Sequence, residues 1–144
     1  MSANLAAPLA SIVTILAVIL YILTLTRAGS MRGKHKIQAP AVVGHPEFER
    51  AYRIQMNTLE AMPIFLPALW LASLYFSPRF PSVWWLPAAL GLLWVIGRYL
   101  YMQSYFADPS KRGTGFGVAG LAAVVLLVLA LVGTIMSWPA MSPA

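Results

Sequence analysis

Four long apolar runs, separated by short polar segments, dominate this sequence of 144 residues. Each run is long enough to cross the roughly 30 Å hydrocarbon core of a bilayer as a helix. Of all residues, 60% are hydrophobic and 10% are charged, whereas a soluble domain carries about 25% charged residues. We therefore expect an all-α integral membrane protein, folded as a single four-helix bundle domain over residues 1–144. The expected helices cover residues 5–26, 48–76, 83–106 and 116–138.

The basic residues are distributed unevenly between the two ends of this bundle. Every lysine and arginine except Arg79 lies in or beside the expected first loop, residues 27–47, or the expected third loop, residues 107–115. The positive-inside rule places both loops in the cytoplasm and both chain termini outside. The net charge of +6 is thus interpreted as a signal of orientation near anionic lipid, and we expect no nucleic-acid binding.

Some kinds of chemistry are excluded or disfavoured by residue counts alone. The chain has no cysteine, which excludes a disulfide framework, a thiolate metal site and a cysteine nucleophile. It has two histidines, His35 and His45, and we expect no metal centre. In the expected fourth helix, small residues favour close helix packing, and they are Gly117, Ala119, Gly120 and Ala123.

The expected second helix carries polar residues on one side of an otherwise apolar segment. At 100° per residue, Arg53, Asn57 and Glu60 lie within about 60° of one another, whereas Gln55 points to nearly the opposite side. Ionisable residues at membrane depth are costly unless they face protein, water or a ligand. This stripe is therefore a candidate binding surface.

The expected third helix carries a matching set. Arg98, Tyr101 and Tyr105 lie within about 60° of one another, and Arg98 lies at a depth similar to that of Glu60. Because an uncompensated buried charge is expensive, we expect Arg98 and Glu60 to be close, either directly or through a ligand. The alternative, an Arg–Glu pair that only locks two helices together, is equally compatible with the spacing.

The chemistry of these side chains suits a small zwitterion with more carboxylates than amines. Arginines bind carboxylates through paired hydrogen bonds, Glu60 would accept an ammonium group, and Asn57 and Gln55 would bind peptide groups. An arginine near a ligand thiol would hold it as a thiolate. The set contains no base–nucleophile pair, so covalent catalysis by the protein is not indicated.

Two stretches resemble a known family. The run GHPEFERAYRIQMNTLEAMPIFLPALWL is similar to the second-helix signature of the MAPEG family, the membrane-associated proteins of eicosanoid and glutathione metabolism. The run GRYLYMQSYFADPSKRGTGF resembles the third-helix and loop signature of its bacterial members. The resemblance covers essentially the whole chain. It implies a homotrimer in the bacterial inner membrane, with glutathione bound between neighbouring subunits at the cytoplasmic face.

The resemblance also implies roles for individual residues. Glutathione would be held by Arg32, Arg53, Gln55, Asn57, Glu60, Arg98, Tyr101 and Tyr105, with Gln55 serving the adjoining subunit's site. Arg112 matches the arginine that stabilises the glutathione thiolate in leukotriene-synthesising members. Ala61 and Gly33 stand where those members have a tyrosine and a second arginine, which weakens a leukotriene-synthesising assignment.

Three functions are compatible with this sequence. The first is a glutathione transferase that presents the thiolate to an apolar electrophile arriving from the lipid, with reduction of lipid hydroperoxides as a second activity. The second is a non-catalytic binder of lipid or glutathione, against which Arg112 argues. The third is a small transporter subunit, which no inverted repeat or broken-helix pair supports.

Overall fold

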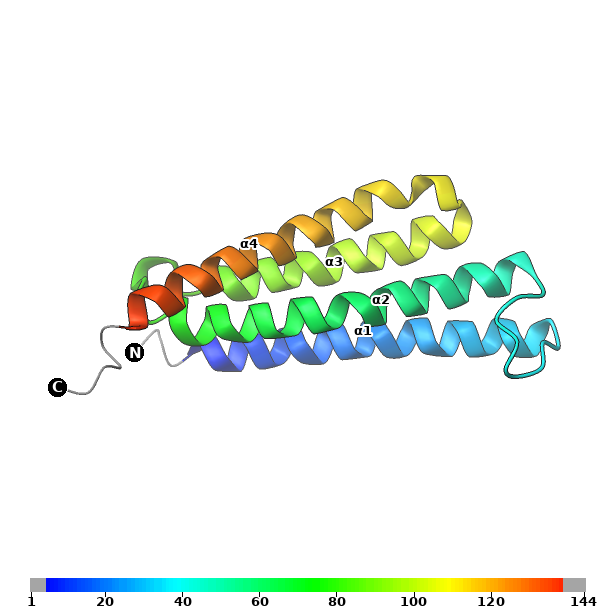
Figure 1. Cartoon of the computed structure of the whole chain (residues 1–144), viewed down its shortest axis with the longest axis horizontal. Helices are drawn as coiled ribbons and strands as arrows, with labels where there is room; N and C mark the ends of the chain where they lie inside the picture. Colours follow the sequence, from blue (N-terminus) through cyan, green and yellow to red (C-terminus); the bar gives the residue numbers. More distant parts are fainter. Residues whose placement is uncertain (1–4, 139–144) are drawn as a thin grey trace.

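The chain forms four long helices packed side by side in an elongated bundle, in a computed structural model that describes residues 5–138. The helices are α1 (Ala6–Lys34), α2 (Pro46–Leu71), α3 (Leu86–Ala107) and α4 (Gly113–Ser137). All four are long and apolar enough to cross a membrane. The first and third loops lie at one end of the bundle, and the start of α1 and the end of α4 lie at the other (Figure 1). The expected all-α four-helix membrane architecture is confirmed.

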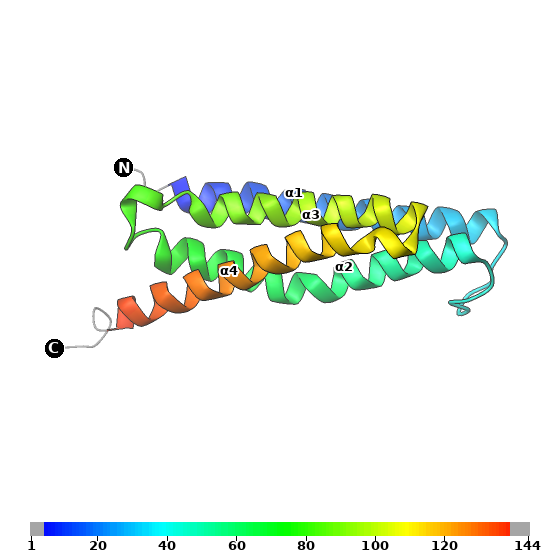
Figure 2. The same ribbon diagram turned by 90° about the horizontal axis from the view of Figure 1, so that it is seen from above.

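Short helical elements join the long helices within residues 5–138. The π-helix η2 (Ala72–Phe76) continues directly from α2, and the 3-10 helix η3 (Pro81–Val83) precedes α3. The 3-10 helix η4 (Pro109–Arg112) joins α3 to α4. Figure 2 shows α4 crossing the bundle from the end of α3 towards η2, where Gly133 packs against the backbone of Phe76.

The first helix is longer than the sequence predicted. It ends at Lys34 and not at residue 26, so about two turns of the expected first loop are helical. Two features explain the extension. The last turn holds Arg32 and Lys34, whose positive charges complement the negative end of the helix dipole, and no proline lies between residue 26 and Pro40.

The third loop is shorter than expected, because its second half is helical. The backbone turns through η4 and enters α4 at Gly113, so the fourth helix begins three residues before the expected position 116. Arg112 therefore lies at the N-terminal boundary of α4 and not in an extended loop. α2 begins at Pro46, two residues before the expected position 48, and the His45 side chain caps it by accepting a hydrogen bond from the backbone N–H of Glu47.

The core combines one aromatic stack with a close contact between α3 and α4. Phe65 and Trp94 stack with their ring centroids 3.9 Å apart and their planes at 1°. At the α3–α4 contact, a Cβ added to Gly115 would lie 2.7 Å from the carbonyl oxygen of Gly97 and even closer to the backbone nitrogen of Tyr101. Only glycine fits at such a separation.

The small residues of α4 divide between two faces. Ala119 and Ala123 are buried, as the close-packing prediction required. For Gly117 and Gly120 the prediction was wrong within this chain, because a Cβ at either position would meet nothing within 4 Å. Gly115, which was not among the residues predicted to pack closely, makes the close contact instead.

We expect Gly115→Ala to destabilise the bundle strongly, because the new methyl group would force α3 and α4 apart. Gly117→Ala is the matched control on the same helix, where alanine gains helix propensity of about 1 kcal/mol without a clash. Circular dichroism of detergent-solubilised protein would follow thermal unfolding of both variants. Equal midpoints for the two variants would contradict the close contact.

Candidate functional site

A cavity of about 720 Å³ lies between α2, α3 and α4. One part of its lining is polar and comes from the predicted site residues Asn57, Glu60, Arg98, Tyr101 and Arg112. The other part is apolar and comes from Ala61, Ile64, Trp94, Phe116, Ala119, Gly120, Ala123 and Val124, with Gly113 completing the lining near Arg112. The fold thus brings five of the nine predicted site residues to one cavity, which we call the first cavity.

Arg98 is the most deeply buried charged residue of this lining, with 2% of its surface exposed. Its Nη2 donates a hydrogen bond to Thr58 Oγ1 at 2.8 Å, and its guanidinium carbon lies 4.3 Å from the centroid of the Tyr101 ring. Its Nε is buried and has no hydrogen-bond partner among residues 5–138. A buried guanidinium with a free donor is suited to binding an anionic or carbonyl oxygen.

Arg98 and Glu60 line the same cavity but make no ion pair in the described part of the chain. The direct form of the predicted pairing is therefore wrong, because Thr58 takes the place expected for the carboxylate. Thr58 lies one turn after Ile54, whose carbonyl oxygen accepts a hydrogen bond from the Thr58 hydroxyl at 2.7 Å. Its role as the arginine's partner was missed, since a lone threonine in a helix usually bonds only to its own backbone.

The polar end of the first cavity is ordered by a hydrogen bond between α2 and α3. Asn57 Nδ2 donates to the Tyr101 hydroxyl at 2.6 Å. The ring of Tyr101 lies 5.5 Å from that of Tyr105, and the guanidinium carbon of Arg112 lies 5.8 Å from the Tyr105 ring centroid. Asn57, Tyr101 and Arg112 therefore surround one volume from three different elements.

Glu60, like Arg112, is exposed on the surface of this chain. It lies within the apolar part of α2, between Leu59 and Ala61, where lipid is a poor environment for a carboxylate. Such a side chain requires cover by a ligand, by water or by another protein surface.

A second cavity, of about 640 Å³, lies between the first loop, the beginning of α2 and the end of α3. It holds two further predicted site residues, Arg53 and Tyr105, together with Glu49 and Arg50. Glu49 Oε1 accepts a hydrogen bond from the backbone N–H of Gly44 at 2.9 Å. Arg50 was not among the predicted site residues, although its position three residues before Arg53 puts it on the same helix face.

The last two predicted site residues, Arg32 and Gln55, line neither cavity. Arg32 Nη1 donates to the carbonyl oxygen of Ala41 at 2.8 Å, and its guanidinium carbon lies 4.6 Å from the Phe48 ring centroid. In this chain Arg32 therefore holds the first loop against α2. Gln55 is half-buried on another side of α2, as the helical wheel predicted.

The turn that carries Arg112 is fixed by Asp108. Asp108 Oδ1 accepts hydrogen bonds from the hydroxyl of Ser110 at 2.8 Å and from its backbone N–H at 3.0 Å. These bonds hold the pKa of the Asp108 carboxyl below its usual value. The ionised carboxylate caps η4, and Arg112 is the last residue of that helix.

The sequence is similar to proteins of known family. A 37% identical protein of Synechocystis, named only as an uncharacterized protein, matches over 84% of this chain and 84% of its own length. Human microsomal glutathione S-transferase 2 is 42% identical over 73% of this chain and 68% of its own length. Guinea pig (Cavia porcellus) leukotriene C4 synthase is 33% identical over 84% of this chain and 77% of its own length.

The model of the MAPEG family matches residues 10–132, which include all four helices almost completely and both cavities. Together with four helices able to span a membrane, this match confirms the resemblance seen in the two signature stretches. The chain belongs to the MAPEG family and is an integral membrane protein.

Proposed function

We propose that this protein is a glutathione transferase that joins the thiol of glutathione to apolar electrophiles. The observation that carries the proposal is the composition of the first cavity, in which Asn57, Glu60, Arg98, Tyr101 and Arg112 line one part and apolar side chains line the rest. A charged tripeptide and an apolar second substrate need such a divided site. Relatives named glutathione S-transferase 2 and leukotriene C4 synthase support the choice of glutathione.

In this proposal the arginines and Glu60 bind the charged groups of glutathione. Arg98 and Arg53 take carboxylates, Glu60 takes the ammonium group, and Asn57 binds a peptide group. Tyr101 and Tyr105 complete the polar wall. Arg32 and Gln55 act in the site of a neighbouring subunit, which accounts for their position outside both cavities of their own chain.

Arg112 stabilises the thiolate. The thiol loses its proton to solvent, and the guanidinium of Arg112 lowers the free energy of the resulting negative charge. The sulfur then attacks the electrophilic carbon, a carbon–sulfur bond forms, and the leaving group departs with its electron pair. Arg112 is an electrostatic stabiliser and not a proton acceptor.

The apolar part of the first cavity takes the electrophile from the lipid. Phe116, Ala123 and Val124 of α4 supply an apolar surface beside the polar wall. The same thiolate would reduce a lipid hydroperoxide by attacking its terminal oxygen, with the alcohol as leaving product and the sulfenic acid of glutathione reduced by a second glutathione to the disulfide and water. No metal enters either reaction.

We further propose that the working form is a homotrimer in a bacterial inner membrane, with both cavities near the cytoplasmic face. The exposed carboxylate of Glu60 within the apolar part of α2 supports cover by a neighbouring copy. The basic residues of the first and third loops support a cytoplasmic orientation of that end. A non-catalytic binder with the same fold remains the second candidate, and it would need no arginine at position 112.

We expect Arg112→Ala to lower kcat for conjugation to an aryl halide by about 10²–10³, the usual effect of removing one preorganised electrostatic group. Binding of glutathione should be largely retained. Ultraviolet absorbance of the bound thiolate, with calorimetry for binding, separates the two effects. Lys111→Ala, one residue away on η4, is the matched control. A normal turnover of Arg112→Ala would contradict the role of Arg112 as thiolate stabiliser.

We expect Glu60→Gln to weaken glutathione binding about tenfold, because an amide accepts an ammonium group less well than a carboxylate. The analogue glutaryl-cysteinyl-glycine, which lacks the amine, should bind the parent protein and Glu60→Gln equally. Calorimetric titration of both ligands into both proteins completes the cycle. If the variant weakens both ligands to the same extent, Glu60 does not bind the amine.

We expect Thr58→Val to destabilise the protein by about 1–3 kcal/mol, because Arg98 loses its hydrogen-bond acceptor while remaining buried. Thr58→Ser keeps the hydroxyl and should behave almost like the parent. Added glutathione should recover part of the loss for Thr58→Val, since the ligand supplies new acceptors. Thermal unfolding with and without glutathione measures both effects, and identical behaviour of the two variants would contradict the role of the hydroxyl.

A further inference from the structure

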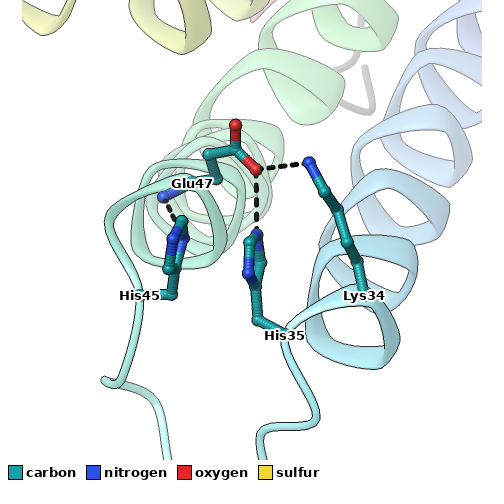
Figure 3. Close-up of polar contacts among 4 residues, drawn as sticks. All are labelled: Lys34, His35, His45 and Glu47. Atoms are coloured by element: carbon teal, nitrogen blue, oxygen red, sulfur yellow. Dashed lines mark hydrogen bonds and ion pairs between the residues drawn. The ribbon is translucent and has the colours of Figure 1, made fainter.

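The two histidines of the chain meet at the base of the first loop. His35 directly follows α1, and His45 directly precedes α2. Their rings stack with centroids 3.5 Å apart and planes at 12°. Figure 3 shows the two rings side by side below Glu47. The loop of residues 36–44 is therefore closed at its base by a pair of imidazoles.

Glu47 joins this pair from the first turn of α2. Its Oε2 lies 2.8 Å from His35 Nε2, and its backbone N–H donates to His45 Nδ1 at 3.2 Å (Figure 3). One ring nitrogen from each histidine and one carboxylate oxygen of Glu47 all lie within 4.8 Å of one another. All three residues are half-buried, which limits the water around them without closing the cluster to solutes.

We propose that His35, His45 and Glu47 form a binding site for a divalent transition-metal cation of the Zn²⁺ type. Two imidazoles and a carboxylate are ligands that Zn²⁺ accepts, at about 2.0–2.2 Å, with water in a fourth position. Ligand atoms around such an ion are about 3.4 Å apart. Because a bound ion lies in the plane of each imidazole, the two rings, which stack nearly parallel, would turn apart to bind one ion. Calcium and magnesium are excluded as preferred ions, because they favour all-oxygen ligands.

The metal must compete with Lys34. The ammonium nitrogen of Lys34 lies 2.7 Å from the same Glu47 oxygen that faces His35 (Figure 3). A divalent cation at the cluster displaces this ammonium group, which is exposed and free to move into solvent. Lys34 therefore sets the affinity of the site by opposing the metal through charge repulsion.

Metal binding would tie the two ends of the first loop together. Val42, Val43 and Pro46 of this segment line the second cavity opposite Arg53 and Tyr105. A bound ion would restrict the motion of that wall. From the sequence, two histidines indicated no metal centre; the fold changes this expectation because it adds Glu47 and brings all three side chains together.

The test is a Zn²⁺ titration of the full-length protein in detergent, purified with an affinity tag that contains no histidine. A competing fluorescent chelator measures the affinity, and visible absorbance of Co²⁺ reports the ligand geometry. Expected results are one Zn²⁺ per chain and binding weakened about tenfold or more by His35→Gln or by His45→Asn. His35→Gln keeps a donor to Glu47, and His45→Asn keeps a helix-capping side chain, so both variants preserve the fold.

Lys34→Gln should change the Zn²⁺ affinity in the opposite direction. This variant should bind Zn²⁺ several times more tightly than the parent, because the competing ammonium group is gone. Lys111→Gln removes the same charge from the third loop and should leave the affinity unchanged. The proposal would be overturned if His35→Gln and His45→Asn bound Zn²⁺ as tightly as the parent protein, or if the parent protein did not bind one Zn²⁺ per chain. Neither outcome bears on glutathione, since no step of the titration contains it.

Discussion

The buried guanidinium of Arg98 is the interaction on which the site depends. A cation this far inside an apolar bundle is tolerated only if the protein supplies compensating groups. Here they are the Thr58 hydroxyl and the face of the Tyr101 ring, which leave the arginine's Nε without a partner in the described residues. The contact between α2 and α3 therefore buries a guanidinium whose hydrogen-bond donors are not all paired. In the proposed function, a carboxylate-bearing ligand relieves that deficit, because the first cavity lies beside Arg98.

The helices and several of their ends could be predicted from hydropathy, but the end of α1 and the start of α4 could not. Uncharged runs define the membrane-crossing part of each helix, because lipid excludes unpaired backbone groups. Outside the lipid this constraint disappears, and local side-chain chemistry determines where each helix ends. Basic residues then extend α1 to Lys34, and the Asp108–Ser110 hydrogen bonds convert half of the third loop into η4. Neither effect has a strong signal in composition, since glycines and charged residues are equally typical of loops.

The candidate site was predicted well where it follows helical geometry and less well where it depends on partners between helices. The spacing of Asn57 and Glu60 on α2, and of Arg98 and Tyr101 on α3, placed these residues on shared helix faces, and all four line the first cavity. Arg53 and Tyr105, which belong to the same two stripes, line the second cavity. The spacing did not indicate that Thr58 would accept the hydrogen bond from Arg98, nor that Arg50 would join Arg53 in the second cavity. Such contacts depend on the rotation and separation of two helices, which a single helical wheel does not contain.

The position of Arg112 shows how a close backbone contact between two helices determines the geometry of a polar site. Gly97 and Gly115 let the backbones of α3 and α4 approach to a distance that admits no side chain. Because Gly115 is only three residues after Arg112, this approach fixes the start of α4 against the Tyr101 and Tyr105 turns of α3. Arg112 is thereby held across the cavity from Asn57 and Glu60 of α2. A larger residue at either glycine would move the arginine away from that wall. The electrostatic part of the site therefore depends on the absence of two side chains as much as on the presence of charged ones.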